Sequence, residues 1–330
     1  MANKAFGFQI VDHYYHQHYK DGKWLEPIFT SNPNIDIEMS ATSLHYGQQA
    51  FEGMKAFRRK DGGINLFRPL ENAKRFRMSC RRMMMPEISD EQFMYAVTET
   101  VKRNVNHIPE YDHNMSLYVR PFMIGTGHNL GLRPAPSYFF GVVVAPVGIY
   151  FKGDTAGKFL IVDEDRAAPN GTGIYKVGGN YGGALKIQFD AKSQGYEDAL
   201  FLDPATHQYL DEFGGANLFA IKDNTYYTPK SSSILKSITN DTLKILAKEK
   251  LGLEILETQI PITDIETFDE MGACGTAASV TPIGSLTYHE KIYHISDTIG
   301  PMTKKLKEML LDIQYGNIKD DNGFQYNVEL

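Results

Sequence analysis

The chain has 330 residues, of which 42% are hydrophobic and 22% are charged, and its formal net charge is -6. This length suffices for two ordinary domains with their own cores, and the composition is that of a folded globular protein rather than a disordered or collagen-like one. The basic residues are scattered, which argues against nucleic acid as a partner, and Cys80 and Cys274 are too few for a disulfide framework or a multi-cysteine zinc site.

The beginning of the chain shows no targeting segment. Residues 1–15 contain neither an unbroken apolar run nor a cleavage site of small residues, so we expect no signal peptide and a cytoplasmic location. His13, His16 and His18 alternate as metal ligands on one strand face would. A polar strand that carries histidines is far commoner than a metal site, so we predict no metal.

Two helices are expected among strand-like apolar runs in the first half of the chain. They span 71–82 and 90–105, and the second has apolar residues at helical spacing. These residues are Phe93, Val97, Val101 and Val105. The first domain is therefore expected to mix α and β structure.

A strand is predicted at 138–144, where aromatic and β-branched residues dominate. The apolar stretch around it is interrupted by Gly141, Pro146 and Gly148 and is shorter than the roughly 18 residues of a membrane-spanning helix, so no membrane segment is expected. Glycines and a proline follow. We therefore predict a smaller N-terminal domain at 1–149, a linker at 150–160 and a larger C-terminal domain at 161–330.

The second half is predicted to alternate strands and helices. Strands are expected at 159–162, 199–203, 217–221 and 253–256, with a turn at Asp223-Asn224. One helix is expected at 238–251, with Ser237 and Thr239 as candidate N-cap residues, and another at 302–315. The fold class predicted for the chain is mixed α and β.

The segment 171–183 has six glycines in thirteen positions and carries Lys176 between Tyr175 and Tyr181. Glycine allows positive φ angles and close approach to a ligand. The segment lacks the Gly-Lys-Ser/Thr of a P-loop and the third glycine of a dinucleotide fingerprint. A flexible turn with a solvated lysine is the simplest interpretation, but a lysine beside phenols is also what Schiff-base chemistry requires.

An acidic pair, Asp211 and Glu212, stands immediately before a glycine turn that leads into an apolar strand. Such an acid is usually a solvated loop residue. In a site that binds a pyridine ring, however, Glu212 is the candidate that would keep the ring nitrogen protonated, and a protonated ring withdraws electrons from a substrate.

Several segments together resemble the branched-chain aminotransferases, which belong to the fold-type IV class of pyridoxal-phosphate enzymes. The resemblance spans nearly the whole chain. It is carried by Phe6-Gly7, Asp12-His13, LHYG at 44–47, FEGMKAF at 51–57, LFRP at 66–69, SLYVRP at 116–121, YKVGGNY at 175–181, GTA at 275–277 and IQYG at 313–316. It implies a two-domain fold with pyridoxal 5'-phosphate at the domain interface.

The resemblance assigns the cofactor side of the site residue by residue. Lys176 is implied to carry pyridoxal phosphate as a Schiff base and then to shuttle the proton at the α-carbon. Tyr181 is implied to hydrogen-bond the phenolic oxygen of the ring, and Glu212 to pair with the ring nitrogen. The phosphate would be held by Arg75, Ile238, Thr239 and Thr276. A helix beginning at Ile238 would offer free N–H groups to an anion, which agrees with this placement.

The substrate side follows from the same resemblance. The pocket must take an aliphatic side chain in one half-reaction and the γ-carboxylate of glutamate in the other. The matching positions are Phe6, Tyr46, Phe51, Tyr118, Arg120, Leu132, Thr276 and Ala277. Arg120 would bind the γ-carboxylate bidentately. In this family the positions of Tyr46 and Leu132 reach across from the other subunit, which implies a homodimer.

The expected activity is the ping-pong transfer of an amino group from L-leucine, L-isoleucine or L-valine to 2-oxoglutarate. Two activities of the same fold remain alternatives, a D-amino-acid aminotransferase and an aminodeoxychorismate lyase. A non-catalytic pyridoxal-phosphate-binding protein is the alternative from another class. The FEGMKAF and SLYVRP segments favour the branched-chain substrates, and the intact Lys176, Tyr181, Glu212 and Arg75 argue against a protein that has lost its chemistry.

Overall fold

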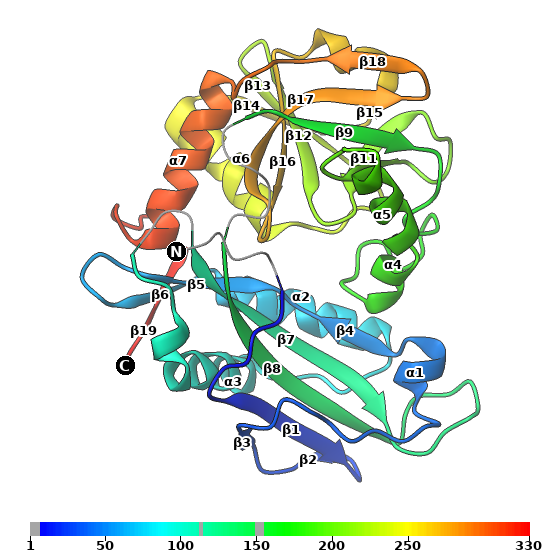
Figure 1. Ribbon diagram of the computed structural model, residues 1–330, viewed down its shortest axis with the longest axis vertical. Helices are drawn as coiled ribbons and strands as arrows, with labels where there is room; N and C mark the ends of the chain where they lie inside the picture. Colours follow the sequence, from blue (N-terminus) through cyan, green and yellow to red (C-terminus); the bar gives the residue numbers. More distant parts are fainter. Residues whose placement is uncertain (1–6, 112–114, 149–154) are drawn as a thin grey trace. The chain divides into compact units, whose positions relative to one another are not determined.

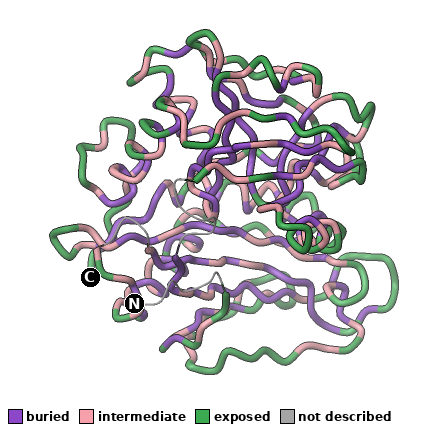
Figure 2. The backbone as a smooth tube through the Cα atoms, turned by 45° about the horizontal axis from the view of Figure 1, so that its top comes forward, coloured by how far each residue is buried: buried purple, intermediate pink, exposed green. Residues whose placement is uncertain are grey.

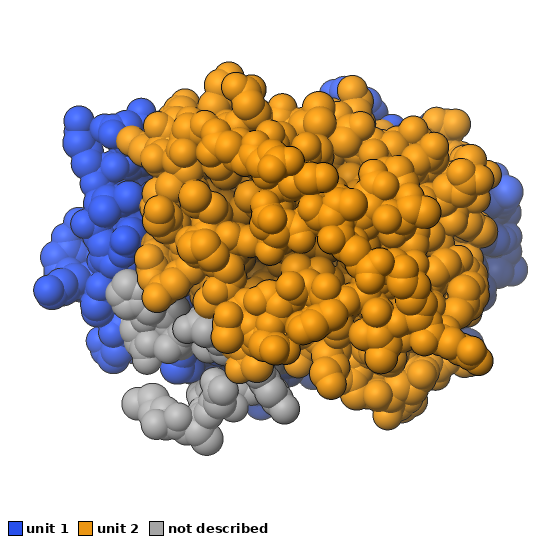
Figure 3. All heavy atoms as spheres, turned by 90° about the horizontal axis from the view of Figure 1, so that it is seen from above, with its two compact units in different colours: residues 1–148, 175–179, 312–330 blue, residues 149–174, 180–311 orange. Residues whose placement is uncertain are grey.

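The protein forms two compact units in a computed structural model that describes residues 7–111, 115–148 and 155–330 (Figure 3). Unit 1 comprises Met1–Gly148, Tyr175–Gly179 and Asp312–Leu330, and unit 2 comprises Ile149–Ile174 and Asn180–Leu311. In both units the strands are largely buried, whereas hairpin tips and loops are exposed (Figure 2). Within the described ranges no helix has the length and apolarity needed to cross a membrane.

The unit boundaries differ from the predicted domains in two segments. Tyr175–Gly179, which carries Lys176, belongs to unit 1 because Val177 forms a β-bridge with Ala50. The C-terminal segment also belongs to unit 1, where its last strand pairs with a strand near residue 65. Lys176 thus belongs to unit 1, whereas the sequence prediction assigned it to the C-terminal domain, and the difference arises from pairing between segments distant in the sequence. Of the predicted linker, 150–154 lies outside the described residues.

Unit 1 is built on a nine-stranded antiparallel sheet. Its strands are β1 (Tyr14–Lys20), β2 (Lys23–Trp24), β3 (Ile28–Thr30), β4 (Gln49–Phe51), β5 (Met54–Arg58), β6 (Ile64–Phe67), β7 (Ser116–Thr126), β8 (Ser137–Val147) and β19 (Gln325–Val328). The order is β19-β6-β5-β7-β8-β1-β2, with β3 beside β1 and β4 beside β7 (Figure 1). The helical elements of this unit are α1 (Thr42–Tyr46), α2 (Pro69–Arg82), α3 (Asp90–Arg103) and the 3-10 turn η1 (Val105–His107).

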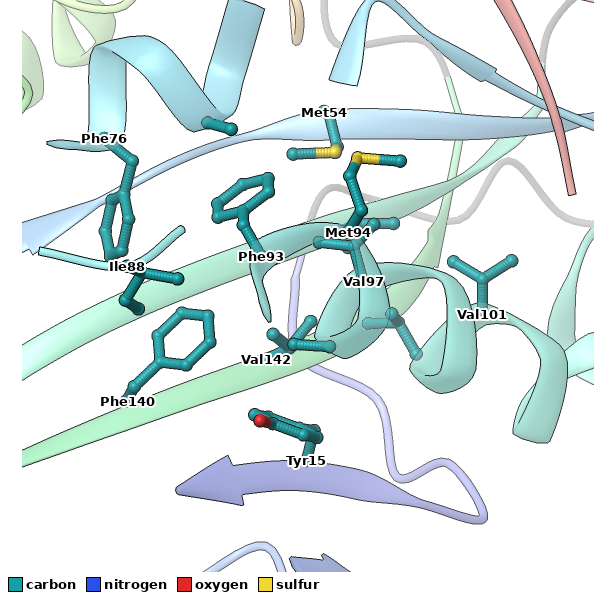
Figure 4. Close-up of a cluster of buried hydrophobic side chains, with 14 of the residues drawn as sticks. Tyr15, Met54, Phe76, Ile88, Phe93, Met94, Val97, Val101, Phe140 and Val142 are labelled. Carbon is teal, nitrogen blue, oxygen red and sulfur yellow. The ribbon is translucent and has the colours of Figure 1, made fainter. Parts of the chain in front are cut away.

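The core of unit 1 lies between the sheet and the helices α2 and α3. Figure 4 shows side chains of both helices directed toward the sheet, where they meet Tyr15 of β1, Phe140 of β8 and Met54 of β5. Phe76 and Phe93 are fully buried there. Burial of a phenylalanine contributes about 1.5 to 3 kcal/mol, so this contact fixes α2 against the sheet.

The two helices of unit 1 were predicted with small errors at their ends. α2 begins at Pro69, two residues before the predicted start, because proline suits the first helical turn, where its missing N–H is not needed. α3 ends at Arg103 rather than at Val105. The Asn104 side chain terminates it by donating to the carbonyls of Thr100 and His13.

Unit 2 contains a ten-stranded mixed sheet. Its strands are β9 (Gly157–Val162), β10 (Ala199–Leu202), β11 (Tyr209–Phe213), β12 (Asn217–Lys222), β13 (Thr225–Pro229), β14 (Glu254–Thr258), β15 (Ile260–Pro261), β16 (Glu270–Gly275), β17 (Ser279–Tyr288) and β18 (Lys291–His294). Because β11 pairs with both β10 and β12, six strands close into a ring. The ring consists of β9, β10, β11, β12, β16 and β17.

The helical elements beyond residue 155 are α4 (Gly178–Gly182), α5 (Leu185–Ser193), α6 (Ile238–Leu251), the 3-10 helix η2 (Ile262–Thr267) and α7 (Pro301–Tyr315). α6 has the predicted bounds, because Ser237 caps its start and Gly252, at φ 68°, ends it. The predicted turn at Asp223-Asn224 is confirmed, with both residues at positive φ between β12 and β13. β11 was not predicted as a strand, because its two acids break the apolar pattern.

Candidate active site

Lys176 is held in unit 1 by hydrogen bonds of its own backbone. Its carbonyl accepts from the N–H of Phe51 at 3.1 Å, and its N–H donates to Ser79 Oγ at 2.9 Å. Ser79 Oγ in turn donates to the carbonyl of Arg75, one turn earlier on α2. The backbone of the lysine is thereby fixed between the end of β4 and one face of α2, and its side chain is partly buried, so the segment is not a flexible turn at this position.

Arg75 forms a buried ion pair with Glu52. Its Nε donates to Glu52 Oε1 at 2.7 Å and one Nη donates to Oε2 at 2.8 Å. Asn72 Nδ2 donates to the same Oε2 at 2.7 Å. Burial raises the pKa of the Glu52 carboxyl, but the charge and hydrogen bonds of Arg75 outweigh this effect and hold the pKa below its usual range. Glu52 is therefore an anion at neutral pH.

The aromatic and cationic side chains predicted to bind substrate lie together beside Lys176. Arg120 donates to the Tyr118 hydroxyl at 2.9 Å and stacks over the Phe51 ring at 4.7 Å from its centroid. Lys176 Nζ lies 4.8 Å from the same centroid. Arg120 Nε is buried without a hydrogen-bond partner among the described residues. A buried donor of this kind favours an anionic acceptor in a ligand.

Burial and a nearby cation tune the amine of Lys176. Burial, together with repulsion from Arg75, lowers its pKa from 10.5 to about 8, while Glu52 and Tyr118 act in the opposite direction. Lys55, which pairs with Tyr118 across the β5–β7 ladder, is also shifted to a pKa of about 8 by burial. A sizeable fraction of Lys176 is thus unprotonated near pH 8, as a nucleophilic amine requires.

The glycines around Lys176 act differently from the prediction. None of the six between 171 and 183 is among the residues with positive φ. Gly173 instead allows close packing, since a Cβ there would lie 2.2 Å from the carbonyl oxygen of Ser233. At Gly178, a Cβ would lie 2.2 Å from Gln49 Nε2. Gly173 and Gly178 are therefore needed for close contact with the protein's own atoms.

In unit 2, Glu212 lies within β11 rather than in a solvated loop, and it is only 4% exposed. Arg166 forms an ion pair with Glu212 Oε1 at 2.5 Å and also donates to the carbonyls of Gly173 and Ser233. The Leu235 N–H donates to Oε1 at 2.8 Å. The carboxylate is therefore kept charged and oriented by a buried guanidinium.

The remaining unit 2 residues gather at one end of its sheet. Asn217 of β12 pairs with Glu212 of β11 on one side and with Cys274 of β16 on the other. Because β16 ends one residue after Cys274, the turn that contains Thr276 and Ala277 begins at the same end of the sheet. Asn217 Nδ2 also donates to the carbonyl of Leu235, three residues before α6. Ile238 and Thr239 are the first residues of α6, and the first turn of a helix, with its N–H groups and the positive end of the helix dipole, favours an anion.

Four of the predicted site residues are not among the contacts described so far, and one of them lies outside the described residues. Tyr181 is on α4, next to the buried Asn180 that anchors Thr172. The Tyr46 hydroxyl donates to the carbonyl of Leu130, and Tyr46 and Leu132 are 44% and 87% exposed. Phe6 lies outside the described residues.

Sequence reasoning missed Glu52, Arg166 and Ser79. Glu52 left a signal, because it is an acid between apolar residues in the segment FEGMKAF. Arg166 and Ser79 left none, because their partners are distant in sequence. No set of three or more histidine, cysteine, aspartate or glutamate side chains in the described part of the chain is arranged to hold a metal.

The arrangement in unit 1 offers an amine with a lowered pKa, two guanidinium groups and aromatic surfaces, with one buried carboxylate. Such a set can bind anions, form a bond from nitrogen to a carbonyl carbon and move a proton. Unit 2 offers a helix N-terminus for a phosphate and a charged carboxylate for a cationic ring nitrogen.

Comparison with known proteins gives consistent results. Residues 49–286 match the family described as amino-transferase class IV. The branched-chain-amino-acid aminotransferase of Haemophilus influenzae is 45% identical over 337 residues, which cover 99% of this chain and 98% of that protein. That of Helicobacter pylori is 45% identical over 318 residues, which cover 95% and 93%.

Solved structures are similar over the same length. The Escherichia coli branched-chain amino acid aminotransferase has a TM-score of 0.82 at 26% identity, covering 97% of this chain and 100% of that chain. A second branched-chain amino acid aminotransferase, from T.th. and solved with pyridoxamine 5'-phosphate, has a TM-score of 0.81 at 26% identity with the same coverage. The fold is therefore the mixed α and β fold predicted from the sequence.

Proposed function

The chain belongs to the class IV aminotransferases, and from this membership we propose that it transfers the amino group of L-leucine, L-isoleucine or L-valine to 2-oxoglutarate. The observation that carries this proposal is the partly buried Lys176, which is fixed by its backbone hydrogen bonds and whose amine has a pKa lowered by desolvation and by the charges of Arg75 and Arg120. Relatives that share 45% identity over almost their whole length are branched-chain-amino-acid aminotransferases.

Pyridoxal 5'-phosphate is the cofactor that the residues fit. When bound, it supplies a carbonyl carbon that condenses with primary amines and a ring that withdraws electrons from the α-carbon. Lys176 supplies the matching amine, and Arg75 supplies a guanidinium held at a fixed orientation. Glu212 supplies the buried carboxylate expected opposite a protonated ring nitrogen.

Each protein group then has a defined task. Lys176 would hold the cofactor through its amine and, when that amine is free, would accept the proton of the substrate's α-carbon and give it back. Its pKa of about 8 suits both directions of this transfer at neutral pH. Arg75 of unit 1, and Thr276, Ile238 and Thr239 of unit 2, would hold the phosphate. Tyr181 would donate to the phenolic oxygen of the ring.

The substrate residues serve two kinds of side chain. Phe51 and Tyr118 offer aromatic surface to an aliphatic chain, while Arg120 binds the γ-carboxylate of glutamate in the return half-reaction. Tyr118 and the Thr276-Ala277 turn bind the α-carboxylate. We propose a homodimer, in which the exposed Tyr46 and Leu132 of one subunit complete the pocket of the other.

The proposal is tested by the visible absorption of the purified protein during two additions. L-leucine should abolish the near-visible band of the bound cofactor, and 2-oxoglutarate should restore it. A band that ignores L-leucine but responds to D-alanine would favour a D-amino-acid aminotransferase. Absence of any band after incubation with pyridoxal phosphate would refute the cofactor assignment. Lys176→Ala should abolish turnover, and retained turnover would contradict the role of the lysine.

A further inference from the structure

We propose that Glu52 is a positioning residue for the cofactor phosphate, acting through Arg75. The inference rests on the proposed function in one respect, namely that Arg75 binds the phosphate. It adds a second residue, without direct contact to the cofactor, whose charge and shape set the direction in which the guanidinium points. The contacts that support it all lie within unit 1.

Glu52 holds Arg75 at two points of its planar head group. Nε donates to Oε1 at 2.7 Å and one Nη donates to Oε2 at 2.8 Å. A bidentate pair fixes both the position and the plane of a guanidinium, whereas a single contact leaves it free to rotate. The side chain of Glu52 is fully buried and that of Arg75 is 10% exposed, so water does not compete for these bonds.

Glu52 is itself held in place by three further contacts. Oε2 also accepts from Asn72 Nδ2 at 2.7 Å and from the backbone N–H of Gly53 at 3.1 Å. The Glu52 N–H donates to the carbonyl of Pro121 on β7 at 2.8 Å. With its lone pairs satisfied and its backbone bound to the sheet, the carboxylate cannot turn away from Arg75.

The same contacts link the guanidinium to the reactive amine. Glu52 follows Phe51, whose N–H donates to the carbonyl of Lys176. The N–H of Lys176 donates to Ser79 Oγ, which donates to the carbonyl of Arg75. A closed circuit therefore runs from Arg75 through Glu52, Phe51, Lys176 and Ser79 back to Arg75, made of hydrogen bonds and of the peptide bond between Phe51 and Glu52. The carboxylate that holds the guanidinium is thus tied to the backbone that carries Lys176.

The charges support a positioning task rather than simple neutralisation. Near Lys176 stand Arg75 and Arg120, both of which repel its protonated form, and Glu52 attracts it. The single carboxylate of Glu52 does not balance the cationic groups around it, so the cluster keeps a net positive charge that an anionic phosphate can offset. Glutamine at position 52 keeps the shape but presents an NH2 group to donors, so it cannot hold both nitrogens of the guanidinium.

The experiment compares the affinity of the cofactor-free protein for pyridoxal 5'-phosphate with its affinity for pyridoxal, which lacks the phosphate. Equilibrium dialysis gives both dissociation constants without relying on turnover. For Glu52→Gln we expect the affinity for pyridoxal phosphate to fall about tenfold or more, the equivalent of one charge-assisted hydrogen bond, with a much smaller change for pyridoxal. Glu52→Asp, which keeps the charge, should recover part of the loss.

Two variants separate this effect from general damage. Asn72→Leu removes one hydrogen bond to Glu52 and leaves the ion pair intact, so it should shift the ratio of the two affinities in the same direction by less. Glu270→Gln is the matched control, because Glu270 is a buried carboxylate of unit 2 that accepts from the N–H groups of Met302 and Thr303. It should leave the ratio unchanged.

The Arg75→Met variant and its combination with Glu52→Gln distinguish the positioning role of Glu52 from the phosphate-binding role of Arg75. Arg75→Met should lower the affinity for pyridoxal phosphate, and the second substitution should add little to it. If Arg75→Met has its effect but Glu52→Gln leaves the ratio unchanged, or weakens both ligands equally, the positioning role of Glu52 is wrong. If Arg75→Met itself leaves the ratio unchanged, the phosphate assignment of Arg75 fails, and the inference fails with it.

Discussion

The lowered pKa of Lys176 predicts that replacing this residue stabilises the cofactor-free protein. Burial and Arg75 bring the pKa from 10.5 to about 8. Between these pH values the unfolded chain binds a proton that the folded chain does not, so the wild-type protein becomes more stable as the pH rises from 8 to 10.5. Below pH 8 the full penalty applies, and at about 1.4 kcal/mol per pH unit it amounts to about 3 kcal/mol.

Lys176→Met has no such penalty and fills similar space. We therefore expect the variant to exceed the wild type in unfolding free energy by up to about 3 kcal/mol at pH 7 and by close to nothing near pH 10.5. Urea unfolding can be followed by the fluorescence of Trp24, the single tryptophan, which lies in β2 of unit 1. Lys60→Met, at an exposed lysine of the same unit, is the control. An equal gain at both pH values, or none at pH 7, would refute the reasoning.

Three further predictions concern other buried groups. Burial raises the pKa of Asp198 from 3.8 to about 6. The Asp198→Asn variant should therefore be more stable than the wild type by up to about 3 kcal/mol at pH 7, where the buried carboxyl is charged, and should show no gain below pH 4. Thermal unfolding at both pH values measures this difference. Arg166→Met leaves Glu212 buried without its cation and should destabilise unit 2 by about 3 to 5 kcal/mol in denaturant unfolding, with partial recovery in Arg166→Lys. Gly53→Ala places a Cβ 2.0 Å from the Tyr118 hydroxyl and should lower kcat/KM for L-leucine about fivefold, and the loss should shrink in a Tyr118→Phe background.

The elements that could be predicted are those whose ends carry local signals. Helix α6 has the predicted bounds because Ser237 and Gly252 flank it, and the turn at Asp223-Asn224 needs only two residues that tolerate positive φ. β11 was missed, although it carries Glu212. Its acids are buried because Arg166 and two serines satisfy them, and that compensation comes from residues outside the strand.

The candidate site shows the same limit. Lys176, Arg75 and Arg120 were proposed as site residues because their residue types match a family pattern, but the groups that contact them in the structure were not predicted. Glu52 is 23 positions from Arg75, and Arg166 is 46 positions from Glu212. Nothing local to either arginine indicates which acid it pairs with. Pairs of this kind follow from the sheet register, which a single sequence does not specify.

The placement of Arg120 supports the proposal that one surface serves two unlike side chains. Its guanidinium stacks on Phe51 and lies 5.1 Å from the centroid of the Tyr118 ring, so its flat face is covered by aromatic carbon. The Tyr118 hydroxyl accepts from one Nη, whereas Nε is buried and lacks a partner among the described residues. An aliphatic side chain can then pack against the rings without displacing the arginine, and a carboxylate can use the edge of the guanidinium. Under the proposed assignment, leucine and glutamate would use different parts of the same stacked cluster, and selection between them would need no movement of the backbone of β7.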